Sequence, residues 1–221
     1  MFNDNVFEKY EVDNGKELRI VFDDCPLDPR TDHDNLGHML CFHNRYSLGD
    51  SHADIESIIL DKIDEDEVDF VGLSPEHFTG WEELENLLWD HVDVVEMLPI
   101  NIHDHSGISL STGMFGSMWD SGRVGLIFVT KDDLEKYGTP DMPAEQIKRI
   151  LEAEVEEYSM YVSGEVFGFE LIKHEKCPHC NHVHNEVIDS GYGFKGFQWE
   201  QNGLYDAAGV TEDQLTRVYP E

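Results

Sequence analysis

The chain has 221 residues, and its 47 aspartates and glutamates against 15 lysines and arginines give a formal net charge of −32. A surface this negative is repelled by nucleic acid and membranes and attracted to basic grooves, which excludes direct binding of nucleic acid. The hydrophobic content of 40% and the aromatic content of 11% exclude a disordered chain, and four cysteines are too few for a disulfide scaffold.

The length fits one large domain or two small ones. No stretch approaches the 18 apolar residues of a membrane span, and the first residues lack the charged-then-apolar pattern of a signal peptide. We therefore expect a cytoplasmic protein.

The first predicted element is a strand over residues 17–23, which are rich in β-branched and aromatic side chains. Residues 25–50 are rich in Asp, Asn, Gly and His and predict a long ordered loop. Two helices follow, each preceded by a pair of residues with capping-box spacing, Ser51 with Asp54 and Thr79 with Glu82.

Residues 98–103 predict a short strand, and residues 124–129 predict a central strand because they are almost entirely apolar. Thr130 and Asp133 have the spacing of a cap on a short helix. Pro143 begins the longest predicted helix, whose apolar side chains recur every three or four residues.

A strand over residues 165–173 leads into a turn-rich module at 174–198, and Thr211–Gln214 cap a short last helix. Because no regular βαβ period is present, we predict an α+β fold with a mixed or antiparallel sheet and several packed helices. We expect residues 1–175 to form an acidic α+β domain. Residues 176–221 are expected to form a small zinc-knuckle-like module and a C-terminal helix packed on that domain.

The sharpest motif is Cys177-Pro-His-Cys180-Asn-His-Val-His184. A C-x-x-C turn places two thiolates on one zinc ion, and two further ligands complete the tetrahedron. With four protein ligands the zinc would be a structural cofactor; the alternatives are free buried cysteines or a reversible disulfide. The candidates for the other two ligands are His182 and His184, with Cys25, Cys41 or a distant histidine as substitutes.

The negative charge is uneven, because residues 1–100 contain 26 acids and 6 bases, a net charge of −20. We expect this part of the chain to form an acidic surface that binds a basic partner. The predicted members of that surface are Asp61, Asp64, Glu65, Asp66, Glu67, Asp69, Glu82, Glu83 and Glu85.

A second constellation is rich in histidine. His103 and His105 alternate along a predicted strand and so face the same way. They could form a metal site or an acid–base cluster with other side chains, or these side chains could simply order long loops by hydrogen bonding. The other members of this set are His38, His43, Asp50, His52 and Asp120.

The sequence contains no nucleophile motif and no phosphate-binding loop. We therefore predict that the protein is not an enzyme and has no catalytic residues. One alternative is a metal-dependent hydrolase that uses His103 and His105. Another is a non-enzymatic regulatory protein stabilised by zinc.

Several blocks of the chain resemble an uncharacterised family of acidic proteins found on phages, plasmids and conjugative elements. The resemblance extends over most of the chain from about residue 25 to residue 198. The blocks that carry it are 34–50, 103–112 and 119–130, extended by 158–169 and 189–196.

This resemblance implies a mobile genetic element, and small acidic proteins of such elements are often counter-defence factors, including anti-restriction and anti-CRISPR proteins. Together with the charge, it predicts a phage protein that acts in the cytoplasm of a bacterial host cell. The expected partner is a basic nucleic-acid-binding effector, either a restriction enzyme or a CRISPR effector. Within this class, the specific expectation is a CRISPR nuclease of the Cas9 type. The acidic surface would act as a DNA mimic and block the loading of nucleic acid.

Overall fold

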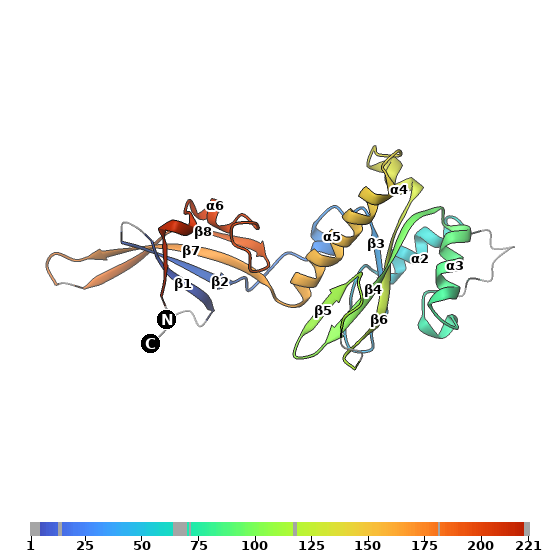
Figure 1. The fold of residues 1–221 in the computed structure, drawn as a ribbon, viewed down its shortest axis with the longest axis horizontal. Coiled ribbons are helices and arrows are strands. Elements are labelled where there is room, and N and C mark those ends of the chain that lie inside the picture. Colours follow the sequence, from blue (N-terminus) through green and yellow to red (C-terminus); the bar gives the residue numbers. More distant parts are fainter. Residues whose placement is uncertain are drawn as a thin grey trace. The chain divides into compact units, whose positions relative to one another are not determined.

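The computed structural model describes residues 5–12, 15–63, 70, 72–116, 119–180 and 182–218 (Figure 1). The chain divides into two compact units. The terminal unit combines residues 1–27 with 160–221, and the central unit comprises residues 28–159. Each unit contains its own antiparallel sheet, so the predicted α+β class is confirmed.

The sheet of the central unit has four strands in the order β3-β6-β4-β5, and every pairing is antiparallel. β6 lies between two other strands, and its residues from Val124 to Thr130 are buried, as the apolar run predicts. The strands are β3 (His38–Cys41), β4 (Val94–Asp104), β5 (Ile108–Ser111) and β6 (Ser121–Thr130).

Helices cover both faces of this sheet (Figure 1). α2 (His52–Leu60) and α3 (Trp81–His91) lie on one face, where their buried side chains pack against Leu126 and Phe128. α5 (Ala144–Val162) lies on the other face. Three short elements complete the unit: α1 (Pro29–Asp32), η1 (Pro75–His77) and α4 (Lys131–Lys136).

The predicted cap of α4 is confirmed, because Thr130 and Asp133 form a reciprocal capping box. Burial alone would raise the pKa of Asp133, but hydrogen bonds from His38 and Thr130 hold it below its usual value. The predicted cap at Thr211 and Gln214 is also confirmed, although it precedes only a single 3₁₀ turn. The two capping boxes predicted before the first helices are wrong. Ser51 makes no side-chain cap, and α3 begins after Gly80.

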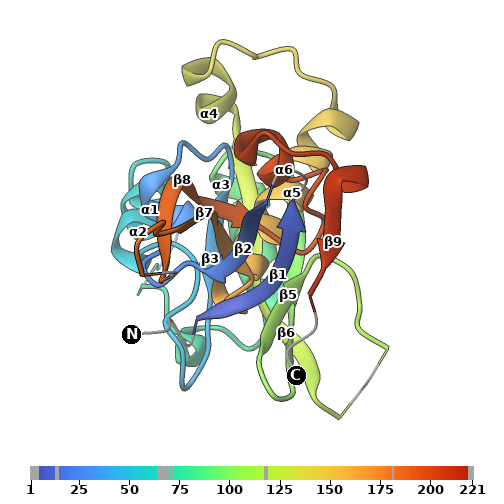
Figure 2. The same ribbon diagram turned by 90° about the vertical axis from the view of Figure 1, so that its left-hand side faces the viewer.

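The sheet of the terminal unit has five strands in the order β8-β7-β2-β1-β9 (Figure 2). α6 (Leu204–Ala208) packs against one face, where Leu18, Phe167 and Phe169 join its buried side chains. η2 (Glu212–Gln214) precedes the last strand. The strands are β1 (Val6–Val12), β2 (Lys16–Phe22), β7 (Val166–Lys176), β8 (Val183–Lys195) and β9 (Leu215–Arg217).

The sequence between residues 174 and 198 forms part of this sheet, which corrects the predicted module. β8 pairs with β7 along its whole length, and β7 pairs in turn with β2 near the N-terminus. The zinc-knuckle-like module is therefore unsupported, and the segment is a β-hairpin with a C-x-x-C turn. The two units are also bounded differently from the expected domains 1–175 and 176–221, because the C-terminal strands share a sheet with the N-terminal ones.

Among the described residues, no helix has both the length and the apolar composition needed to span a bilayer.

A buried guanidinium joins three distant segments of the central unit. The side chain of Arg30 is 2% exposed, and it forms a bidentate ion pair with Asp50 at 2.7 and 2.8 Å. Its Nη1 also lies 3.0 Å from Glu154 Oε2, and its Nη2 donates to the Gly37 carbonyl. Glu154 also accepts hydrogen bonds from the backbone of Leu36 and Gly37. Burial raises the pKa of Glu154, and the charge of Arg30 offsets this only in part.

We predict that Arg30→Met lowers the free energy of unfolding by about 3–5 kcal/mol at pH 7, because two buried carboxylates lose their cation. A buried carboxylate without its cation has a raised pKa in the folded variant. The loss of stability is therefore smallest below about pH 4.3, the pKa of a glutamate in the unfolded chain, and grows as the pH rises above it. Urea unfolding at pH 5.5 and pH 8 measures the difference. Arg149→Met is the control on exposed α5 surface; equal losses in the two variants would contradict the prediction.

Candidate functional site

The central unit contains a cavity of about 1040 Å³. It lies between the loop that follows β3 and the N-terminal ends of α2 and α3. Gly49 allows the loop to turn back, because its φ is +74° and a Cβ there would lie 2.4 Å from the Met39 carbonyl oxygen. The lining includes Phe42, His43, Arg45, Tyr46, Asp50, His52, Phe78 and Trp81.

Aromatic rings form much of this lining and contact one another. The Phe42 ring lies 5.0 Å from His52 and 5.9 Å from Trp81, and His43 stacks on Tyr46 at 4.8 Å. Trp81 stands at helical spacing with Leu84 and Leu88, a pattern typical of a core position. The aromatic residues of the loop were not predicted as a site; the one indication in the sequence is their close spacing between Phe42 and Tyr46.

Three polar side chains of the cavity, those of His43, His52 and Asp50, are held by neighbours. His43 Nδ1 accepts hydrogen bonds from the backbone N–H groups of Arg45 and Tyr46, so a neutral His43 carries its proton on Nε2. His52 Nε2 lies 2.8 Å from the Cys41 carbonyl oxygen and donates to it. Asp50 is paired with buried Arg30. The arrangement is that of a binding cavity with fixed walls.

The one thiol in the cavity wall is a poor nucleophile. Burial, with a smaller contribution from the charge of Asp50, raises the pKa of Cys41 to about 12. The Cys41 side chain therefore remains a neutral thiol at physiological pH, whereas the reactive form of a cysteine is the thiolate.

The histidines and aspartates of the predicted cluster lie in separate places. His38 bonds to Asp133 at the start of α4, whereas His43 and His52 line the cavity. The rings of His103 and His105 are 6.1 Å apart, and His105 Nδ1 lies 3.3 Å from Asp120. Within the described ranges, no three His, Cys, Asp or Glu side chains are arranged to hold a metal ion.

The described members of the predicted acidic surface lie on α3 or directly after α2. Glu82 and Glu83 are exposed on α3, and Asp61 follows α2. Glu83 accepts hydrogen bonds from Thr79, and Glu85 pairs with Arg123 at 2.5 Å. Five other predicted members, Asp64, Glu65, Asp66, Glu67 and Asp69, lie outside the described residues.

The charge is concentrated in the central unit. Its 132 residues contain 30 acids and 8 bases, a net charge of −22, whereas the terminal unit carries −10. Residues 52–93 of the sequence contain 14 acids and one base. The two helices of this stretch, α2 and α3, carry six acids and no lysine or arginine, and we call their outer surface the acidic face.

The two cysteines of the C-x-x-C motif lie in the turn of the β7–β8 hairpin. The backbone N–H of Cys177 donates to the His182 carbonyl oxygen at 2.8 Å and closes the turn. The backbone N–H groups of His179 and Cys180 point at the Cys177 sulfur and lower its pKa, and the Cys180 thiol adds to this effect. Backbone donors that stabilise a thiolate favour metal binding at this turn.

The other predicted zinc ligands do not join this pair. The rings of His182 and His184 lie 5.0 Å apart at the start of β8. Cys41 is buried on β3 of the central unit, and Cys25 is an exposed free cysteine in the terminal unit. The described part of the chain therefore brings only the two thiols together as ligands.

Comparisons with protein-family models, with curated proteins and with solved structures found no match to this chain.

In metal-free protein, we predict that iodoacetamide at pH 8 modifies Cys177 rapidly and leaves Cys41 unmodified. The lowered pKa of Cys177 gives more thiolate at this pH, and the pKa of about 12 keeps Cys41 protonated. Peptide mass spectrometry over a pH series measures both rates. Cys180→Ala removes the thiol donor that helps to stabilise the thiolate and should shift the Cys177 profile to higher pH. Equal rates for Cys177 and Cys41 would contradict the assignment.

Proposed function

We propose that the protein is a non-enzymatic inhibitor that docks its acidic face on the basic nucleic-acid groove of a defence effector. The observation that carries this proposal is the charge of residues 52–93, which include the acidic face and contain 14 acids and one base. The candidate effectors are restriction enzymes and CRISPR nucleases, with a Cas9-type nuclease as the specific expectation. A groove that neutralises phosphates offers the complementary charge.

The geometry supports docking by this face because six of the 14 acids of residues 52–93 are carried on α2 and α3, two helices with buried inner sides. Leu84 and Leu88 are almost fully buried under α3, so the outward residues Glu82 and Asp90 are held on a rigid scaffold. Such fixed charges steer association and exclude other anions. Inhibition then follows from occupation of the groove, and zinc in the terminal unit would have a structural role.

We predict that reversing Asp54, Glu82 and Asp90 to lysine slows association with the effector about tenfold or more, with little effect on stability. These residues are exposed on α2 and α3. The matched control reverses the same number of charges in the terminal unit at exposed acids, Glu11, Glu200 and Asp206. Association rates are measured by biolayer interferometry on nucleic-acid-free CRISPR nucleases and restriction enzymes at 50 and 300 mM salt.

Three results would contradict the proposal. One is that no effector of the panel binds. Another is that binding is unchanged by salt and by competing DNA. The third is that both sets of reversals slow association equally, which would indicate a general effect of net charge without a defined face.

A second candidate function is supported by the cavity, which lies at the N-terminal ends of the helices that carry the acidic face. Its aromatic walls favour an apolar or aromatic side chain from the partner, because Arg45 already lies over the Tyr46 ring and Arg123 over the Trp81 ring. The cavity would then anchor the complex after the charges have steered it together.

We predict that Tyr46→Ala speeds dissociation of the complex about tenfold and leaves association unchanged, because it removes an aromatic wall and no charge. Tyr137→Ala, on α4 of the same unit, is the control. Both rates come from the same interferometry. An effect of Tyr46→Ala equal to that of Tyr137→Ala would show that the cavity is not an anchor.

A further inference from the structure

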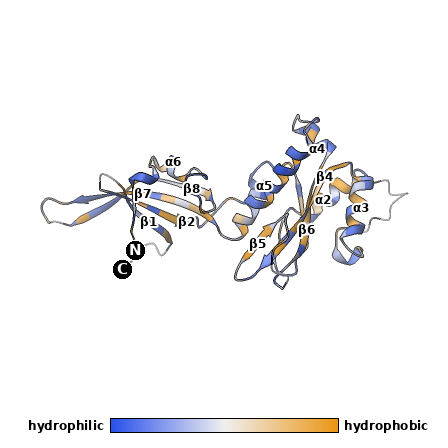
Figure 3. Ribbon diagram, viewed as in Figure 1, coloured by the Kyte–Doolittle hydropathy of each residue, from blue (hydrophilic) through white to orange (hydrophobic). Residues whose placement is uncertain are grey.

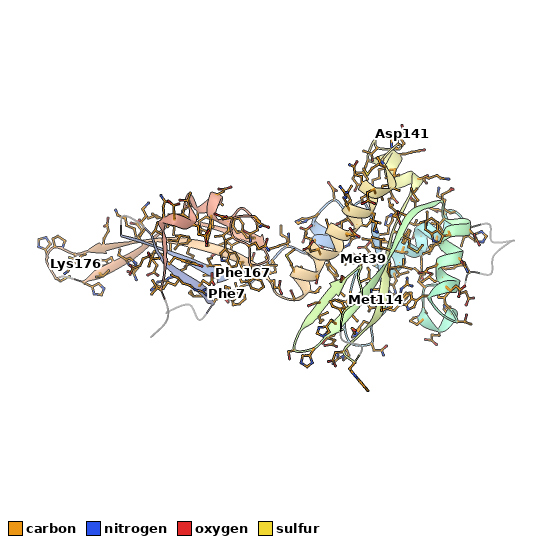
Figure 4. All side chains as sticks on the ribbon, in the orientation of Figure 1. Phe7, Met39, Met114, Asp141, Phe167 and Lys176 are labelled. Carbon is orange, nitrogen blue, oxygen red and sulfur yellow. The ribbon has the colours of Figure 1, made fainter. Side chains whose placement is uncertain are left out.

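The outer end of the β7–β8 hairpin is a ribbon of only two strands (Figure 1). Pairing of β7 with β2 ends at Lys173, and beyond that point β7 pairs with β8 alone. We call residues 173–187 the outer ribbon; Lys176 lies near its tip (Figure 4). A two-stranded ribbon is only marginally stable in water, so a clip at its tip would stabilise it.

The tip presents two sulfur ligands toward solvent. Cys177 is half-buried and Cys180 is exposed, and hydrogen bonds to the Cys177 sulfur pre-arrange the pair. Zinc in a closed structural site takes four ligands in a tetrahedron. Across the described residues no third His, Cys, Asp or Glu completes the site, so one chain supplies half of the coordination shell.

The charge of the outer ribbon differs from that of the rest of the chain. It contains two lysines and two glutamates, so its formal net charge is zero in a protein that carries −32. Lys173 and Glu175 form an ion pair on it at 2.5 Å. Two copies of most acidic surfaces would repel each other, whereas two neutral ribbons can approach closely.

The outer ribbon also leaves apolar side chains exposed, although it is mainly hydrophilic (Figure 3). Val183 is 48% exposed and Val187 is 52% exposed, and both lie on β8. Contact between two ribbons would remove apolar surface from water, at Val183 beside the tip and at Val187 at the base of the ribbon.

We propose that two copies of this chain join at their hairpin tips and share one zinc ion, bound by Cys177 and Cys180 of each copy. The four thiols lose their protons to solvent as the zinc–sulfur bonds form, and no oxidation occurs. The pairing gives an assembly with two acidic faces, which would increase avidity for a partner with repeated basic sites. The proposal stands independently of the identity of that partner.

The test uses the full chain purified without added metal and then loaded with Zn²⁺. Elemental analysis gives the zinc content, and light scattering after size exclusion gives the mass. We expect about half a zinc ion per chain and a dimer. Treatment with EDTA should give monomers, and their far-UV circular dichroism spectrum should match that of the dimer because both sheets remain folded. Titration of the metal-free chain with Co²⁺ should saturate at about half an equivalent.

Substitutions assign the ligands. Cys177→Ser and Cys180→Ser should each abolish zinc binding and the dimer, whereas Cys25→Ser, at an exposed cysteine outside the hairpin, should retain both. His182→Ala and His184→Ala should also retain both. If the tip variants fail to fold, the EDTA and Co²⁺ measurements on the unaltered chain still show whether two chains share one metal ion.

Several results would overturn the proposal. A monomer with one zinc ion, lost in His182→Ala, would place the whole site within one chain. A dimer that persists in EDTA would place the contact elsewhere. Absence of bound metal, or a Cys177–Cys180 disulfide found by mass spectrometry in freshly purified protein, would remove the site altogether.

Discussion

The buried guanidinium of Arg30 is the group on which the central unit depends. It joins α1, the end of the loop after β3 and α5 through ion pairs with Asp50 and Glu154. In a unit with a net charge of −22, segments this acidic would otherwise repel one another. Because Asp50 also lines the cavity, the same ion pair fixes the wall of the candidate binding site. An arginine suits this position, since its planar fork can satisfy several oxygens at once.

Local patterns in the sequence predicted the elements whose causes are local. The apolar run of β6 and the cap formed by Thr130 and Asp133 belong to this class. Strand pairing and ion pairing between segments distant in the sequence could not be predicted. β3 lies within the region predicted as a loop, because a four-residue strand has too little pattern to stand out. The role of Arg30 depends on Glu154, 124 residues away, which no periodicity reveals. The C-x-x-C motif does form a turn, and its zinc remains a prediction. Its further ligands depend on reach across the hairpin, and the described residues do not bring them together.

The division of charge between parts of the molecule links its structure to the proposed function. α2 and α3, over one face of the central sheet, carry six acids and no lysine or arginine, whereas α5 on the other face carries both signs of charge and the outer ribbon of the terminal unit is neutral. Like charges make most of the surface of one copy repel that of another, but two copies can still associate through a neutral segment. We propose different partners for the two surfaces, a basic groove for the acidic face and a second copy of the chain for the hairpin tip. The cavity beside the acidic face adds aromatic contacts where charge alone gives little affinity.

The most direct test of the central claim is hydrogen–deuterium exchange of this protein with and without a nucleic-acid-free effector that it binds. If the acidic face is the docking surface, the peptides of α2 and α3 and the loop that lines the cavity exchange more slowly in the complex than in the free protein. Exchange in strands β1 and β2 of the terminal unit is unchanged. Protection confined to the terminal unit, with α2 and α3 exchanging as in the free protein, would contradict the account.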